Sequence, residues 1–266
     1  MQKKAPIIIV LLLAAAATLL ISRKVNQKDA VTIVQEEEVA LPVNVIPVEE
    51  RPFITLTPDA IGRNLSLYID RLTTSAETLE YELIYQTIEG DQGAFGRINL
   101  KTESQPITKS ILLGSKSAGG AVTYYPGVSG GSIALTWGAT KIKENFNFVT
   151  FDPSDPTVST QDGRLTLVLS AKSLKKGDKI VTMKTSGYPA PIPDSVAKVL
   201  AGPYAILTPT SLKSIVRLEI KLPAGEHQNP TVYELIAGKW SKLKTILKND
   251  TLTAIPISNT FIVTSE

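Results

Sequence analysis

Apolar and polar residues alternate in short stretches along most of the chain after residue 50. The clearest stretch is Asn64–Asp70, in which Leu65, Leu67 and Ile69 are separated by residues of the opposite face. Successive side chains of a β-strand point to opposite sides, so this pattern predicts a strand that is buried on one side only. Residues 79–85 repeat the pattern with leucine or tyrosine at every second position.

Comparable stretches recur about every 10 to 15 residues, with glycine, proline and other turn residues between them. No segment of helix length shows a 3.6-residue period, and a parallel α/β fold needs crossover helices. Residues 186–203 carry several prolines and glycines, so we expect an irregular connection there. The sequence therefore predicts an all-β protein of the antiparallel sandwich type. Besides the two stretches above, the expected strands are residues 53–56, 95–100, 107–113, 122–125, 132–137, 145–151, 164–170, 179–185, 215–222, 231–236, 240–243, 252–257 and 260–263.

One segment departs from this pattern, because Ile7–Ile21 is an unbroken apolar run. Lys3 and Lys4 precede the run, and Arg23 and Lys24 follow it. With its small neighbours the run approaches the roughly 20 residues that a membrane-spanning helix needs, and the flanking basic side chains can reach the two interfaces. We interpret residues 1–24 as an uncleaved, single-pass membrane anchor. A cleaved secretory signal and a buried helix are the alternatives.

The rest of the chain divides by composition into a linker and two domains. Residues 25–50 contain a run of glutamates and recurring prolines and predict an extended linker, although residues 39–48 are apolar enough to pair as an edge strand instead. Two tandem antiparallel β-sandwich domains of the immunoglobulin-like kind are expected at residues 51–156 and 157–266.

Charge supports that division. Residues 49–157 carry 9 Lys and Arg against 13 Asp and Glu, whereas residues 158–266 carry 14 against 8. The second domain is therefore basic and the first acidic. A polyanion is one partner that a basic domain attracts, while scattered lysines also keep a β-surface soluble.

The last quarter of the chain resembles a known module. The strand pattern that carries the resemblance comprises Val216–Leu222, Thr231–Glu234, Gly238–Trp240 and Phe261–Val263. It is similar to the final strands of the β-sandwich module of ankyrins and netrin receptors. The layout as a whole resembles membrane-anchored bacterial surface proteins with immunoglobulin-like modules. The resemblance implies an extracytoplasmic binding or structural role, and it carries over no catalytic residue.

The residue types present exclude several kinds of site. With no cysteine and one histidine, the usual ligand set of a zinc site cannot be assembled. Gly127–Gly131 matches the G-x-S-x-G pattern of a nucleophile elbow, but a strand rather than a helix is expected after Ser129. We therefore predict no catalytic residue and no cofactor. Nucleic-acid binding is not expected either, because the basic residues of the second half are mostly scattered lysines.

Two candidate binding sites remain. Asp152, Asp155 and Asp162 bracket the expected domain boundary and are candidate ligands for Ca²⁺, which prefers flexible carboxylate-rich loops. Asp-Pro and Asp-Gly are also ordinary turn formers. Tyr124 and Tyr125 are candidate ligand-binding residues that would form an exposed aromatic platform, and packing at the rim of a sandwich is the alternative reading.

Taken together, the pattern favours a membrane-anchored extracytoplasmic protein with an adhesion, scaffolding or ligand-binding role and no catalysis. Its expected partners are the membrane, through Ile7–Ile21, and a surface protein, glycan or polyanion. A cell-envelope enzyme that acts on carbohydrate through paired carboxylates is one alternative. A structural subunit that self-assembles is another.

Overall fold

The computed structural model describes residues 41–265, which belong to one compact unit, Leu41–Glu266. The predicted anchor, Ile7–Ile21, lies outside the described residues. Within residues 41–265 no helix is long and apolar enough to span a bilayer. The helical content of this part is a single turn, the 3₁₀-helix η1 (Val48–Glu50).

The described chain is built from strands, which confirms the all-β prediction. The strands are β1 (Phe53–Pro58), β2 (Asn64–Asp70), β3 (Thr78–Thr87), β4 (Gly90–Asn99), β5 (Ile107–Leu112), β6 (Gly114–Lys116), β7 (Val122–Tyr124), β8 (Gly130–Trp137), β9 (Thr140–Thr150), β10 (Thr157–Ser159), β11 (Leu165–Leu169), β12 (Lys179–Lys184), β13 (Lys198–Leu207), β14 (Ile215–Lys221), β15 (Thr231–Ile236), β16 (Lys239–Lys242), β17 (Ile246–Lys248), β18 (Thr251–Ala254) and β19 (Thr260–Ser265).

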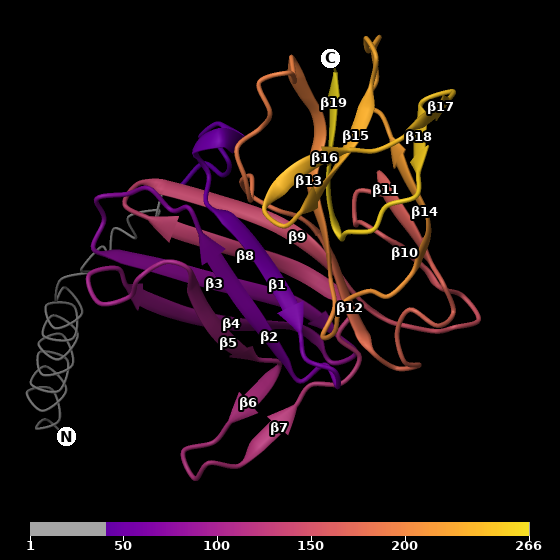
Figure 1. Ribbon diagram of the computed structural model, residues 1–266. Coiled ribbons are helices and arrows are strands. Elements are labelled where there is room, and N and C mark those ends of the chain that lie inside the picture. The colour runs from indigo at the N-terminus through magenta and orange to yellow at the C-terminus, as the bar shows by residue number, and fades with distance from the viewer. Residues whose placement is uncertain (1–40, 266) are drawn as a thin grey trace, which may run out of the picture. The chain divides into compact units, whose positions relative to one another are not determined.

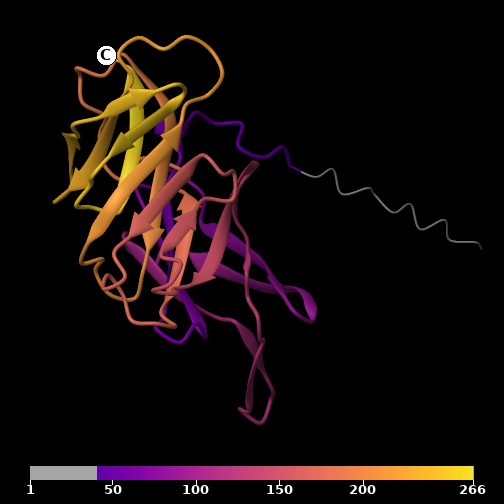
Figure 2. The same ribbon diagram turned by 90° about the vertical axis from the view of Figure 1, so that its right-hand side faces the viewer.

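Antiparallel pairing organises these strands into sheets (Figure 1). The largest, which we call the long sheet, has nine strands in the order β16-β15-β19-β13-β12-β9-β8-β3-β4. A three-stranded sheet, β1-β2-β5, and a five-stranded sheet, β10-β11-β14-β18-β17, pack against it. The remaining pair, β6-β7, forms an arm that projects from the body in both views (Figures 1 and 2).

The two smaller sheets cover opposite faces of the long sheet, and β12 shows this directly. Its Val181 and Met183 belong to the core beneath β1-β2-β5, whereas Ile180 belongs to the core beneath the five-stranded sheet. Strand β9 behaves in the same way, because Phe146 faces the first core and Val149 the second. The middle of the long sheet is therefore a layer shared by two sandwiches.

The boundary predicted after residue 156 separates neither two independent bodies nor the two cores, because Val181 and Met183 belong to the first core and Phe151 to the second. Strand β9 precedes that boundary and β12 follows it, yet the two strands pair from Lys179↔Thr150 to Met183↔Phe146. The two sandwiches consequently share one sheet and are not joined end to end.

Two other expectations need correction. Residues 41–50, predicted as part of a linker, pack on the body, and Val43 forms a parallel bridge with Lys141, in line with the alternative of strand pairing. Residues 198–203, predicted as an irregular connection, belong to β13 in the interior of the long sheet. The ladder between β13 and β19 shifts register on either side of Ala201, and these irregularities accommodate the Gly202-Pro203 pair.

Candidate functional site

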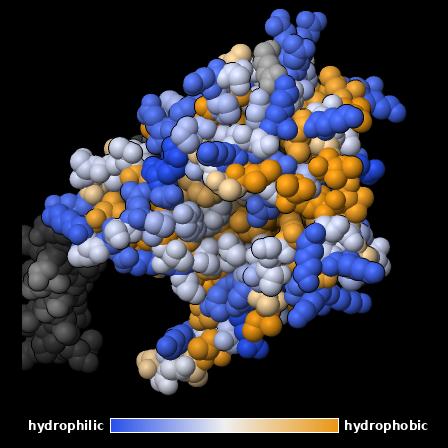
Figure 3. Space-filling view, viewed as in Figure 1, coloured by the Kyte–Doolittle hydropathy of each residue, from blue (hydrophilic) through white to orange (hydrophobic). Residues whose placement is uncertain are grey.

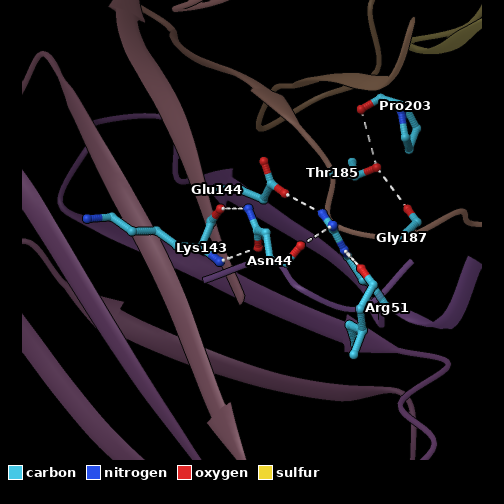
Figure 4. A network of polar contacts seen from close by, with 8 residues as sticks. Asn44, Arg51, Lys143, Glu144, Thr185, Gly187 and Pro203 are labelled. Atoms are coloured by element: carbon cyan, nitrogen blue, oxygen red, sulfur yellow. Dashed lines mark hydrogen bonds and ion pairs between the residues drawn. The ribbon is translucent and has the colours of Figure 1, made fainter. Parts of the chain in front are cut away.

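The segment that precedes β1 is fixed to β9 by Asn44 (Figure 4). The Asn44 side-chain amide donates to the carbonyl of Lys143 at 2.9 Å and accepts the Lys143 backbone N–H at 2.9 Å. The backbone N–H of Asn44 also donates to the carbonyl of Lys141 at 3.0 Å. Asn44 thus makes the hydrogen bonds that a neighbouring strand would make to residues 141–143 of β9.

Arg51 closes the loop that Asn44 begins. Its Nε donates to the carbonyl of Ile46 and its Nη2 to the carbonyl of Asn44, each at 2.8 Å. Its Nη1 lies 3.7 Å from Oε1 of Glu144, and both side chains are nearly buried. We call Asn44, Arg51, Lys143 and Glu144 the N-terminal clamp.

The far side of the N-terminal clamp is closed by the connection after β12. A Cβ placed on Gly187 would lie 2.0 Å from the carbonyl oxygen of Arg51, so the two backbones are in direct contact. Thr185 donates its hydroxyl to the carbonyl of Gly187 at 3.0 Å and fixes that approach (Figure 4). A glycine is required at position 187 because a larger residue would displace residue 51.

Glu144 is the unusual member of this set. It follows Ile142 and precedes Phe146 at two-residue spacing, so the strand carries its carboxyl toward the interior, and the residue is 8 % exposed. Burial raises the pKa of Glu144 to about 7, and the positive charges of Lys184 and Arg51 act in the opposite direction. A carboxyl with this pKa exchanges its proton near neutral pH.

A polar pocket adjoins Glu144 where β9 and β12 meet the turn between β10 and β11. We call it the seam pocket; its volume is about 310 Å³, and it is lined by Glu144, Asn145, Thr160, Gln161, Asp162 and Lys184. Asp162 is held by the Thr160 hydroxyl at 2.6 Å and the Arg164 N–H at 3.1 Å. The pocket therefore offers two carboxyl groups and one ammonium group to a small polar ligand.

A second hollow lies on the solvent side of the long sheet, over β3, β4, β8 and β9. Its volume is about 520 Å³, and its walls carry two ion pairs, Arg97 with Glu80 and Lys141 with Glu82. Phe95 of β4 also lines it and is 68 % exposed. Exposed charge and one exposed aromatic ring are features of a contact surface rather than of an enclosed reaction site.

Apolar side chains also reach the surface of the second sandwich. Figure 3 shows them gathered on the side where Figure 1 labels β14 and β17. The exposed large apolar residues of these strands are Val216, Ile246 and Leu247. Contiguous exposed apolar residues commonly mark contact surfaces.

The structure does not gather the three candidate calcium ligands into one group. Asp152 and Asp155 share one turn, in which the N–H and the hydroxyl of Ser154 bind Oδ1 of Asp152 and lower its pKa. Asp162 lies in the separate turn described above. Among residues 41–265, no three His, Cys, Asp or Glu side chains gather as a metal site would require. Calcium binding stays a prediction.

The predicted aromatic platform is divided between surface and interior. Tyr124 is 39 % exposed at the base of the β6-β7 arm, and the guanidinium of Arg63 lies 4.3 Å from the centre of its ring. Tyr125 turns inward, packs against the first core and lies 6.5 Å from the ring of Tyr85. Of the two residues, only Tyr124 is exposed to solvent, and ligand binding there stays a prediction.

The turn at Ser129 leads directly into β8, so the G-x-S-x-G segment lacks the helix of a nucleophile elbow, as predicted. Sequence reasoning did not single out Glu144, although its position on the same strand face as Ile142 and Phe146 was the available signal.

A comparison of the chain with family models, curated proteins and solved structures found no match. The resemblance to the ankyrin and netrin-receptor module therefore stays a prediction.

Proposed function

We propose that this protein is a non-catalytic binding and scaffolding protein, held at the extracytoplasmic side of a membrane through Ile7–Ile21. The observation that carries the proposal is the N-terminal clamp. It fixes the segment that follows the expected anchor to β9, and β9 contributes side chains to both cores. A tether attached there presents both sandwiches as one body, which suits display of a contact surface.

The surfaces of the body support a binding role. Phe95 on the long sheet and Val216, Ile246 and Leu247 on the second sandwich are exposed apolar residues on separate sheets. Tyr124 and the projecting arm add a third exposed region. A protein, glycan or polyanion at the cell surface is the partner class that we propose.

The test is the location and orientation of the full chain in a bacterial host. Because the chain has no cysteine, Ser117→Cys at the tip of the arm provides a unique thiol. We expect the protein in the membrane fraction after alkaline extraction and labelling of Cys at position 117 by a membrane-impermeant maleimide in intact spheroplasts. Ala205→Cys, at a fully buried position, is the control that labels only after denaturation. A soluble protein, or labelling at position 117 only after lysis, would contradict the proposal.

One observation favours a second candidate function, a cell-envelope enzyme acting on carbohydrate. Glu144 and Asp162 line the same pocket, and a carboxyl with a pKa of about 7 has the character of a general acid. The matching experiment incubates the full chain with a panel of envelope glycans and measures released reducing ends. Release that both Glu144→Gln and Asp162→Asn abolish would establish the enzyme, and no release by the unaltered chain would remove it.

A further inference from the structure

Strand β4 forms one margin of the long sheet, and its backbone is paired on one side only. Its ten residues, Gly90–Asn99, pair with β3, and no other strand of residues 41–265 pairs with its second side. The other marginal strands are shorter: β16 has 4 residues, β10 and β17 have 3 each, and β1 and β5 have 6 each. A long open strand margin is a template for another strand.

The direction of the backbone groups along β4 follows from its neighbours. The Leu100 N–H donates to the carbonyl of Glu77, which continues the β3–β4 ladder beyond the end of the strand. Antiparallel strands direct the N–H and C=O of alternate residues to the same side. Even-numbered residues of β4 are therefore bonded to β3, and the backbone groups of Asp91, Gly93, Phe95 and Arg97 point outward.

These outward residues are complementary to the same strand in a second copy. In an antiparallel pair centred on Ala94, Asp91 lies opposite Arg97 of the second copy, and Gly93 lies opposite Phe95. The two-fold symmetry repeats each contact, so the interface contains two pairs of opposite charge. All four outward residues then occupy hydrogen-bonded positions and form about eight backbone hydrogen bonds.

The side chains of this face also fit that register. A Cβ placed on Gly93 would lie 2.8 Å from Cε2 of Phe95, so the Phe95 ring leans along its own strand over Gly93. Gly93 of the second copy then lies directly opposite Phe95. The Phe95 rings of the two copies meet near the symmetry axis, above Gly93 and Ala94 of each copy. An aromatic ring over a cross-strand glycine covers backbone that is otherwise exposed. Phe95, exposed in the single chain, would be covered.

We propose that β4 is a self-association site, at which a second copy of this chain adds its own β4 in antiparallel register centred on Ala94. The two long sheets then continue into one another across a two-fold axis. This inference is independent of the clamp and of the proposed display role, because it rests on β4 alone.

Disulfide trapping on the full chain tests the register. Adjacent non-hydrogen-bonded residues of antiparallel strands have Cα atoms about 4.5 Å apart, within the roughly 4.4–6.8 Å range of disulfides. We expect Ala94→Cys to form a covalent dimer under mild oxidation in detergent, seen by non-reducing electrophoresis. Gln92→Cys is the matched control on the same face of β4, because the two copies of position 92 would be roughly 13 Å apart along the strands.

Charge exchange gives a second, independent readout. In the Ala94→Cys background, Asp91→Arg and Arg97→Asp each place like charges opposite one another and should lower the yield of covalent dimer about fivefold. A mixture of the two charge variants restores both opposite-charge pairs and should recover the yield as a heterodimer. Retained thermal transitions in each variant exclude loss of fold as the cause.

The outcomes are distinct. Covalent dimer from Ala94→Cys but not from Gln92→Cys, with recovery in the mixture, supports the self-association site. No dimer from Ala94→Cys, equal crosslinking of both cysteine variants, or failure of the mixture to recover the yield would overturn it. Because the native chain has no cysteine, every disulfide in these variants joins the two introduced thiols.

Discussion

Glu144 shows how strand phase determines the chemistry of a single residue. Glu144 lies on the same face of β9 as Ile142 and Phe146, so its side chain points into the interior although burial disfavours its charged form. Its neighbour Arg51 is already engaged with two backbone carbonyls and approaches the carboxyl only to 3.7 Å. Burial therefore outweighs the nearby positive charge, and the pKa of Glu144 rises to about 7.

This raised pKa predicts a definite pH dependence of stability. The folded protein binds the Glu144 proton more tightly than the unfolded chain, whose glutamate pKa is near 4.5, so this group lowers the free energy of unfolding as pH rises from 4.5 to 7. The loss is on the order of 3 kcal/mol and is complete above pH 7. Glu144→Gln should lack this dependence, as measured by urea denaturation from pH 4 to pH 8. Parallel curves for the two proteins would contradict the expectation.

Gly187 carries a steric constraint instead of an electrostatic one. Gly187→Ala would set a methyl group against the carbonyl of Arg51 and should lower the free energy of unfolding by about 2 kcal/mol, because backbone atoms cannot yield as a side-chain end does. Gly119→Ala at the tip of the arm is the matched control, since its Cβ meets only the Ser117 hydroxyl at 3.9 Å. Thermal unfolding of the two variants should separate them clearly, and an equal effect would show that the contact at Arg51 is not constraining.

At the scale of the element, the short strand β10 depends on the long sheet for its position. The carbonyl of Ser159 accepts hydrogen bonds from Nδ2 of Asn147 at 2.9 Å and from the hydroxyl of Thr182 at 2.7 Å. These donors come from β9 and β12, the two strands that join the sandwiches. A three-residue strand is thereby attached to the shared layer as well as to β11.

A double-mutant cycle tests this attachment. Thr182→Val or Asn147→Leu alone should cost about 1 kcal/mol, because the Ser159 carbonyl keeps one donor. The double variant should cost more than the sum, since the carbonyl then loses both donors. Chemical denaturation of the three variants gives the coupling energy, and strict additivity would show that the shared carbonyl does not couple the two side chains.

The elements also show which parts of the fold were open to prediction. Strand β2 was predicted because burial on one face leaves a period of two, and Leu65, Leu67 and Ile69 are indeed fully buried. Strand β13 was missed because Gly202-Pro203 normally interrupts a central strand, and only the register shifts against β19 allow it there.

Tertiary pairing and the candidate site were harder to foresee. The β9–β12 ladder joins strands on opposite sides of a composition boundary, and no local pattern specifies a partner so distant in sequence. Residues 41–50 were assigned to a linker from their prolines, whereas Asn44 fixes them to β9. The burial of Glu144 was readable from its phase, but its closeness to Lys184 and Arg51 depends on the fold.

At the scale of the whole molecule, two cores that share one layer should unfold together. Ile180→Ala removes side-chain volume from the second core and Met183→Ala from the first, although the two residues lie on the same strand. Each substitution should lower the free energy of unfolding by roughly 2–5 kcal/mol, the usual cost of such core truncations. Differential scanning calorimetry should show one transition that both substitutions shift to lower temperature. Two transitions, each sensitive to one substitution, would show independent sandwiches.

The N-terminal clamp has a mechanical consequence. A pulling force applied to the chain before residue 41 reaches Asn44 and Arg51 before it reaches β1. The clamp is therefore a sacrificial latch: its rupture frees residues 41–52 and lengthens the tether by about 40 Å while both cores stay intact. A protein held by its N-terminal segment under load would then yield in a first small step and keep both sandwiches folded. Optical-tweezers extension traces should contain this short event ahead of the main unfolding event, and Asn44→Ala should remove it.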